Sequence, residues 1–114
     1  MRYKREGTMF WNKDTPVYVY GAGLKGRLIY NLLDELGCNM CGFLDQASEN
    51  IRFERKVFHP DQLAEEKRMS SIVICSVANV FEHGKIALEL TKQGYRYIVH
   101  KEFVEGGGKI VIKK

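Results

Sequence analysis

A glycine-rich segment is the part of this sequence whose residue types and spacing could do chemistry. Residues 21–26 read Gly-Ala-Gly-Leu-Lys-Gly, which is a G-x-G-x-x-G pattern. A β-rich run at 17–20 precedes the pattern, and apolar residues at helical spacing begin at Leu24. Asp45 closes the next predicted strand, about 20 residues after the last of the three glycines. This combination is typical of a turn that binds the pyrophosphate of a dinucleotide.

Each glycine of this turn has a physical part in such binding. Gly21 permits a tight turn out of the strand, Gly23 lets a ligand approach the backbone closely, and Gly26 lets the helix pack against the sheet. The helix N-terminus offers N–H groups and a partial positive charge to phosphates. The predicted cofactor-binding residues of the turn are Gly21, Ala22, Gly23, Leu24, Lys25 and Gly26. A glycine-rich strand-to-helix turn that binds nothing is the alternative interpretation.

Two further residues are expected at the same site. The carboxylate of Asp45 would accept hydrogen bonds from ribose hydroxyls and would repel a 2′-phosphate, so the sequence predicts NAD rather than NADP. The alternative is that Asp45 only ends a strand and starts a turn. Ser76 follows the apolar run 71–75, and ligands of open α/β sheets bind at the carboxyl ends of such strands. We therefore expect Ser76 to bind cofactor, with residues 77–79 lining the same pocket.

The cysteines are expected to serve packing rather than redox or metal chemistry. Their number is odd, three in all, which favours reduced thiols. Cys38 and Cys41 form a C-x-x-C, but the pair follows the predicted end of a helix, where the helix dipole does not activate a thiol. The sequence has no second C-x-x-C and no H-x₃₋₅-H to complete a zinc site. We expect neither a disulfide nor tightly bound zinc at this pair.

No set of residues for acid–base or nucleophilic catalysis is visible. His59, His83 and His100 are scattered without a partnering carboxylate or nucleophile, so we interpret them as structural or solvated. Tyr97 and Lys101 have the Y-x-x-x-K spacing of short-chain dehydrogenases. That pair must share a helical face, whereas a strand would separate the two residues by ~13 Å. We therefore predict no catalytic residue and no metal ligand.

The elements that must position the turn alternate between strand and helix. The predicted strands cover 17–20, 40–44, 57–58, 71–75, 97–99 and 109–113. The predicted helices cover 24–36, ended by Gly37, a short segment from Pro60, and 80–93, capped by Asn79 and ended by Gly94. Such alternation predicts the α/β class, with a mostly parallel sheet, helices on both faces and a doubly wound topology. The expected organisation is an N-terminal extension at 1–16, one domain at 17–104, and a Gly-rich turn with a last strand at 105–114.

Composition and charge restrict the class of protein. A chain of 114 residues with 45% hydrophobic and 28% charged residues predicts one globular domain. The net charge is +4, but segments 1–16 and 109–114 carry +2 and +3, which leaves −1 for 17–108. We interpret this excess as solvated tails and expect no nucleic-acid partner. No apolar run approaches the ~20 residues that span a bilayer, and no secretory signal is visible, so we expect a cytoplasmic protein.

Several motifs together resemble one known domain type. They are the turn with Val19 and Tyr20 before it, Gly42-Phe43-Leu44-Asp45, Phe58-His59-Pro60, and Ile72-Val73-Ile74-Cys75-Ser76. The chain resembles the Rossmann-like N-terminal domain of bacterial nucleotide-sugar enzymes that make surface polysaccharides. These are the membrane-linked epimerase/dehydratases and the sialic-acid-type sugar acyltransferases. The chain differs from them in lacking a long catalytic portion after the domain and a glycine before the short third strand.

The resemblance implies a stand-alone domain that binds NAD or a nucleotide-sugar such as a UDP-sugar. It would serve nucleotide-sugar and polysaccharide metabolism, as a homodimer or with a partner catalytic subunit. Any enzymatic role would be that of an NAD-dependent nucleotide-sugar oxidoreductase or epimerase component. The alternative from another class is a non-catalytic partner-binding or regulatory protein with a vestigial nucleotide pocket. The joint presence of the glycine turn and Asp45 favours the binding domain.

Overall fold

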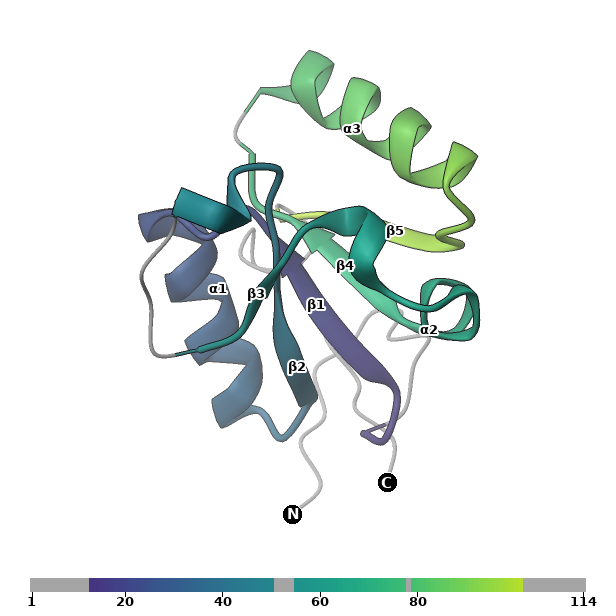
Figure 1. Ribbon diagram of the computed structural model, residues 1–114. Coiled ribbons are helices and arrows are strands. Elements are labelled where there is room, and N and C mark those ends of the chain that lie inside the picture. The colour runs from purple at the N-terminus through teal and green to yellow at the C-terminus, as the bar shows by residue number, and fades with distance from the viewer. Residues whose placement is uncertain (1–12, 51–54, 78, 102–114) are drawn as a thin grey trace.

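Five strands form one parallel sheet at the centre of the computed structural model, which describes residues 13–50, 55–77 and 79–101 (Figure 1). The strands are β1 (Pro16–Tyr20), β2 (Asn39–Leu44), β3 (Val57–Phe58), β4 (Ile72–Cys75) and β5 (Tyr97–His100). They lie in the order β3-β2-β1-β4-β5, and every neighbouring pair is parallel. The predicted α/β class is confirmed, and the architecture is Rossmann-like.

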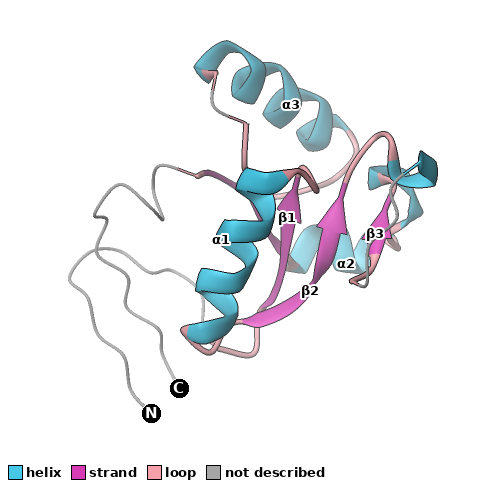
Figure 2. Cartoon of the chain, turned by 90° about the vertical axis from the view of Figure 1, so that its left-hand side faces the viewer, coloured by secondary structure: helices cyan, strands magenta, loops and turns pink. Residues whose placement is uncertain are grey.

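Helices cover both faces of this sheet, as a doubly wound fold requires. The helices are α1 (Leu24–Glu35), η1 (Ser48–Asn50), η2 (Pro60–Gln62), α2 (Glu65–Ser70) and α3 (Val80–Lys92). Figures 1 and 2 show α1 on one face, while α2 and α3 lie on the other. The chain therefore changes face between β3 and β4, after its first three strands.

The core is divided into two layers because side chains of β1 alternate between the faces. Val17 and Val19 pack towards α1, whereas Tyr18 and Tyr20 pack towards α3. All four residues of β4 are buried, as a continuous apolar run requires when both faces of the strand are covered. The layer under α1 includes Ile29, Leu33, Phe43, Ile72 and Ile74, and the other layer includes Leu44, Val73, Cys75, Leu90 and Tyr95.

The predicted ends of the long helices are confirmed by their capping geometry. Oδ1 of Asn79 accepts hydrogen bonds from the N–H groups of Phe81 at 2.7 Å and Glu82 at 3.3 Å. Gly37 follows α1 with φ of +90°, and Gly94 follows α3 with φ of +97°. Only glycine adopts this left-handed conformation without steric cost, so both glycines terminate their helices.

The prediction of one continuous short helix from Pro60 is wrong. The segment is divided into η2 and α2, because Leu63 and Ala64 between them are extended, with ψ of 140° and 153°. Pro60 begins the first piece, as predicted. The break leaves carbonyl groups of this segment without helical partners, and a side chain of α2 satisfies two of them.

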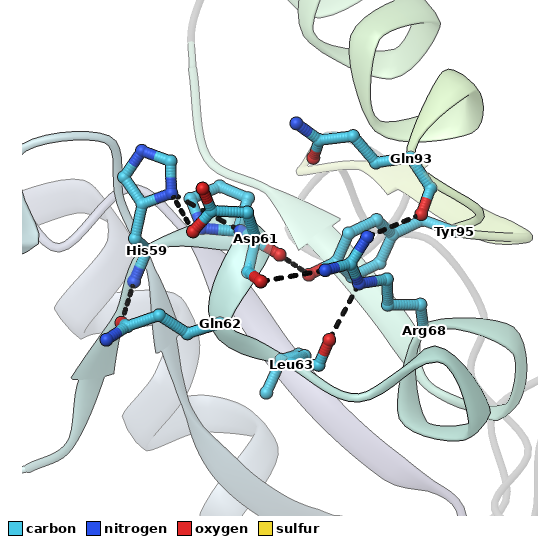
Figure 3. A network of polar contacts seen from close by, with 8 residues as sticks. His59, Asp61, Gln62, Leu63, Arg68, Gln93 and Tyr95 are labelled. Carbon is cyan, nitrogen blue, oxygen red and sulfur yellow. Dashed lines mark hydrogen bonds and ion pairs between the residues drawn. The ribbon is translucent and has the colours of Figure 1, made fainter.

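That side chain is Arg68, which joins three parts of the chain (Figure 3). Its guanidinium donates to the carbonyl oxygens of Leu63 at 2.8 Å, Asp61 at 2.8 Å and Gln93 at 2.9 Å. It also lies 5.8 Å from the centre of the Tyr95 ring, whose hydroxyl donates to the carbonyl of Pro60. Burial raises the pKa of Tyr95 to about 12, so this phenol stays a protonated donor at neutral pH. The crossover from β3 to β4 is thereby fixed to the end of α3.

Some predicted features lie outside the described residues. These are the strand at 109–113, the segment 105–114, and the first twelve residues of the 1–16 extension. β1 begins at Pro16, one residue before the predicted domain boundary. In the part of the chain that the structure describes, no helix is long and apolar enough to cross a bilayer.

The contact between α1 and β1 depends on two glycines of the turn. A Cβ atom at Gly26 would lie 1.9 Å from the carbonyl oxygen of Gly21, which is far inside van der Waals contact. Gly21 itself has φ of +100°, and a Cβ there would lie 2.4 Å from Oγ of Ser76. Gly26 is thus required for the backbone of the helix to meet the backbone of the strand, as the sequence pattern predicts.

We predict that Gly26→Ala lowers the free energy of unfolding by about 3 kcal/mol, because the added methyl group must push α1 away from β1. Gly23→Ala is the matched control and should cost at most about 1 kcal/mol, as a weaker N-cap of α1. Urea titration followed by circular dichroism measures both. Equal stabilities of the two variants would contradict the packing role of Gly26.

Candidate functional site

The candidate site lies at the carboxyl edge of the sheet between β1 and β4, because these neighbouring strands lead into helices on opposite faces. β1 leads into α1 on one face of the sheet, whereas its neighbour β4 leads into α3 on the other face. The loops that follow these two strands separate at the carboxyl edge, and ligands of open α/β sheets bind in the crevice that results. The predicted turn, the loop after β2 and Ser76 all lie at this edge (Figure 1).

Asp45 is joined directly to the glycine turn. Its Oδ2 accepts a hydrogen bond from the N–H of Ala22 at 3.0 Å, and its Oδ1 accepts one from the N–H of Ala47 at 2.9 Å. The N–H of Gly21 donates to the carbonyl of Leu44 at 2.8 Å. The structure therefore brings together the turn and the carboxylate that the sequence places about 20 residues apart. Asp45 also starts the turn after β2, as its alternative interpretation states.

Ser76 lies beneath the turn. The side chain is buried, and its Oγ donates to the carbonyl of Tyr20 at 2.7 Å. The backbone N–H of Ser76 donates to the same carbonyl oxygen at 3.1 Å. Ser76 thus holds the end of β1 in place rather than presenting its hydroxyl hydrogen to the crevice. Of the neighbours predicted to line a pocket, Val77 is half-buried, Ala78 lies outside the described residues, and Asn79 caps α3.

Gly23 differs from the other two glycines of the turn. It is exposed and has φ of −79° and ψ of −170°, a conformation open to any residue. Apart from its two chain neighbours, no described residue has a heavy atom within 4 Å of the position of its Cβ. Neither backbone strain nor packing within the described chain thus requires glycine here. Open space in front of a glycine leaves the adjoining N–H groups accessible to a ligand.

The N-terminus of α1 is open to an anion. Within the described residues no side chain caps it, and its first turn contains no acidic residue. Leu24 and Lys25 in this first turn are exposed, with Leu24 77% accessible. Arg27 was missed by the sequence analysis, and its Nε donates to the carbonyl of Ala22 at 3.0 Å. Ala22 is thus held by Asp45 through its N–H and by Arg27 through its carbonyl, and the guanidinium of Arg27 adds a positive charge beside the turn.

A pocket of about 220 Å³ lies between α3 and the carboxyl edge of the sheet. Its walls are Tyr20 at the end of β1 and Gln46 in the loop after β2, together with Lys85, Ile86, Glu89 and Leu90 from α3. Tyr20 precedes Gly21, and Gln46 follows Asp45, so two of the wall residues are chain neighbours of the predicted site. Burial raises the pKa of Tyr20, which keeps this phenol neutral near physiological pH. The sequence analysis missed the pocket because three distant segments form it.

The expectation that His59 has no partnering carboxylate is wrong. Nδ1 of His59 lies 2.7 Å from Oδ1 of Asp61, and both belong to the start of η2 (Figure 3). The N–H of His59 donates to Oε1 of Gln62 at 2.6 Å, which completes a capping box. The sequence His-Pro-Asp-Gln carries this signal, since a polar N-cap is followed by Pro at N1 and Gln at N3.

The other two histidines are not scattered either. The rings of His83 in α3 and His100 at the end of β5 meet edge to face, with centroids 4.8 Å apart. Nε2 of His100 lies 3.0 Å from the carbonyl oxygen of Val77. Nδ1 of His83 is buried and has no hydrogen-bond partner among the described residues. Burial lowers the pKa of His83, and the neighbouring His100 lowers it further.

The remaining chemistry-bearing residues take the positions predicted for them. Tyr97 begins β5 and Lys101 follows its end, so the pair does not share a helical face. Cys38 is buried between α1 and β2, and Cys41 lies within β2 and is half-buried. Burial raises the pKa of Cys75, which makes its thiol a poor nucleophile. In the described ranges, no group of three or more His, Cys, Asp or Glu residues is placed to hold a metal ion.

Comparison of the chain with family models, with curated proteins and with solved structures finds no significant match. The function is therefore inferred from the geometry of the carboxyl edge itself.

We predict that the protein loses stability as the pH falls below about 6.5, the ordinary pKa of histidine. The folded state disfavours protonated His83, so the unfolded chain takes up that proton first, and this protonation stabilises the unfolded chain relative to the fold. His83→Gln should flatten the decline between pH 7.5 and 5. Chemical denaturation at a series of pH values measures the slopes. Equal slopes for wild type and His83→Gln would show that His83 does not cause the loss of stability at low pH.

Proposed function

We propose that this protein binds a nucleotide, with the pyrophosphate at the turn formed by residues 21–26 and NAD as the preferred ligand. The observation that carries the proposal is the difference among the three glycines. Gly21 and Gly26 are required by the contact between strand and helix, whereas Gly23 faces open space in an ordinary backbone conformation. A ligand that must approach the backbone closely would explain why residue 23 is a glycine.

The electrostatics of the turn support an anionic ligand. The N–H groups in the first turn of α1 point out of the helix end, and the helix dipole gives them a partial positive charge. The side chain of Arg27 binds the turn at Ala22, and the exposed Lys25 belongs to the turn itself. A pyrophosphate would accept hydrogen bonds from these N–H groups without burying an unpaired charge.

Asp45 retains the capacity to bind ribose. Each carboxylate oxygen accepts one backbone N–H in the structure, and each has a second lone pair. Ribose hydroxyls would donate to those lone pairs, while the clamp to Ala22 holds the carboxylate beside the turn. A 2′-phosphate would lose these bonds and meet a negative charge, which supports NAD over NADP.

The pocket between α3 and the carboxyl edge supports a nucleoside as the rest of the ligand. Ile86 and Leu90 provide apolar surface for a planar base, and the amide of Gln46 provides both a donor and an acceptor at the edge. Gln46 of the pocket wall follows Asp45 in the chain, so we propose that the base of a ribose bound to Asp45 occupies this pocket. A UDP-sugar shares the pyrophosphate and ribose and is the alternative ligand. In that case the domain would serve nucleotide-sugar metabolism with a partner catalytic subunit.

Binding is tested with a thermal-shift panel of NAD, NADP, a UDP-sugar and CoA. A ligand at 100 times its dissociation constant adds ~2.7 kcal/mol to the free energy of unfolding, which is a measurable shift. Gly23→Val places a branched side chain where the pyrophosphate would lie, and we predict a loss of affinity of at least about tenfold. Gly23→Ala should give an intermediate loss.

Calorimetry on the wild type and both Gly23 variants gives the affinities. Absence of binding by every ligand of the panel would overturn the proposed function. Binding that is unchanged in Gly23→Val would instead place the ligand elsewhere on the protein.

We predict that Asp45→Asn narrows the preference for NAD over NADP. The amide keeps the shape of the carboxylate but removes its charge and one acceptor, so NAD affinity should fall while repulsion of a 2′-phosphate disappears. The variant also loses one of the two backbone hydrogen bonds of Asp45 and is expected to be less stable. The ratio of the two affinities, measured by titration below the melting temperature, is independent of that loss. An unchanged ratio would leave Asp45 as a turn residue.

A further inference from the structure

The outward face of α3 exposes apolar side chains to solvent. Phe81 is 84% accessible, and Leu88, two turns later, is 59% accessible. Gly84 lies between them on the same face, one turn from each, and no described residue apart from its chain neighbours and the adjacent backbone of α3 comes within 4 Å of its Cβ position. Both ribbon views show α3 as the outermost layer on its side of the sheet (Figures 1 and 2). Exposed apolar side chains that share one helix face form a candidate interaction surface.

The charges beside this apolar face have a self-complementary order. Along α3 they are Glu82, Lys85, Glu89 and Lys92, separated by three, four and three residues. These three separations are the same when the helix is followed from its C-terminus to its N-terminus. In that direction each position that holds a Glu in the forward order holds a Lys, and each that holds a Lys holds a Glu. An antiparallel copy of the helix therefore sets each Glu opposite a Lys in a single register.

These four side chains are available for such pairing. All four are exposed, and among the described residues none of them forms an ion pair within 4.0 Å. Their spacing along the helix would permit pairs within α3 itself, but the structure shows the side chains apart.

We propose that α3 packs against α3 of a second copy of this chain in an antiparallel, twofold-symmetric pair. In the register that the charges define, Lys85 lies opposite Glu89 of the second copy, and Glu82 lies opposite Lys92 of the second copy. Each pair occurs twice because the contact is isologous. The twofold axis then passes close to Leu88, so the two copies of this leucine meet at the centre.

The same register suits the remaining residues of the face. Phe81 lies beside the aliphatic stem of Lys92 of the second copy, which buries its ring. Gly84 lies beside Thr91 of the second copy, and the absence of a side chain at Gly84 lets the two helices approach. Apolar, small and charged positions thus all find suitable partners in one arrangement.

A second copy suits this surface better than a uniformly charged partner. An acidic helix would meet Glu82 and Glu89, and a basic helix would meet Lys85 and Lys92, so either would face two like charges. One helix pair is a small contact compared with the ~1,200 Å² of a standard interface. The dimer is therefore concentration-dependent, with its population rising across the micromolar range.

The helix pair can be tested separately from the proposed nucleotide site. Lys85 and Glu89 line the pocket as well, so they are unsuitable for a test. Glu82, Leu88 and Lys92 do not line the pocket, and changes at these positions report on the helix pair alone.

Sedimentation of the full chain across a concentration series measures the monomer–dimer equilibrium. Leu88→Glu should raise the dissociation constant by at least about tenfold, because two carboxylates meet at the twofold axis. Leu28→Glu is the matched control, since Leu28 is 57% accessible on α1 and should leave the equilibrium unchanged. A protein that stays monomeric at all concentrations, or a dimer that Leu88→Glu does not weaken, would overturn the proposal.

A charge exchange tests the antiparallel register. Glu82→Lys and Lys92→Glu should each weaken the homodimer by about tenfold, because each change sets like charges opposite one another in both pairs. An equimolar mixture of the two variants should regain wild-type association, since every contact between them then joins a Glu and a Lys. Circular dichroism of each variant verifies that α3 is intact. A mixture that associates no better than the separate variants would overturn the register.

Discussion

The contact between the backbones of α1 and β1 determines the geometry of everything at the carboxyl edge. With no side chain at Gly26, the first turn of the helix lies directly on the carbonyl of Gly21. The helix end is consequently held at the crevice between β1 and β4, where its N–H groups are exposed. Asp45 and Ser76 then fix the turn from two neighbouring strands, through Ala22 and through the end of β1. Gly23 occupies the open position within this bonded arrangement.

Much of the fold follows from local sequence signals. The strand runs, the cap at Asn79 and the terminating glycines Gly37 and Gly94 each depend on a few adjacent residues, and the structure confirms them. The break between η2 and α2 was not predictable in this way. Its extended residues are stabilised by Arg68, whose partners include a carbonyl at the far end of α3. A long-range contact of this kind leaves no periodic trace in the sequence.

The same distinction applies to the candidate site. The turn and Asp45 were identified because their spacing is a recurrent pattern with a mechanical basis. Ser76 was placed at the right edge, but its burial and its bond to the end of β1 depend on the packing of β4 beside β1. The pocket beneath α3 and the pairing of His83 with His100 arise from segments that only the fold brings together. Sequence spacing could not place them.

The network around Arg68 also has a consequence for how the protein opens. β3 is only two residues long and lies at the edge of the sheet, so its ladder alone would exchange readily with solvent. Arg68 joins the segment that follows β3 to Gln93 at the end of α3. Fraying of the sheet edge and of the last turn of α3 therefore become one cooperative event. Amide hydrogens in these two regions, distant in sequence, should exchange at a common rate.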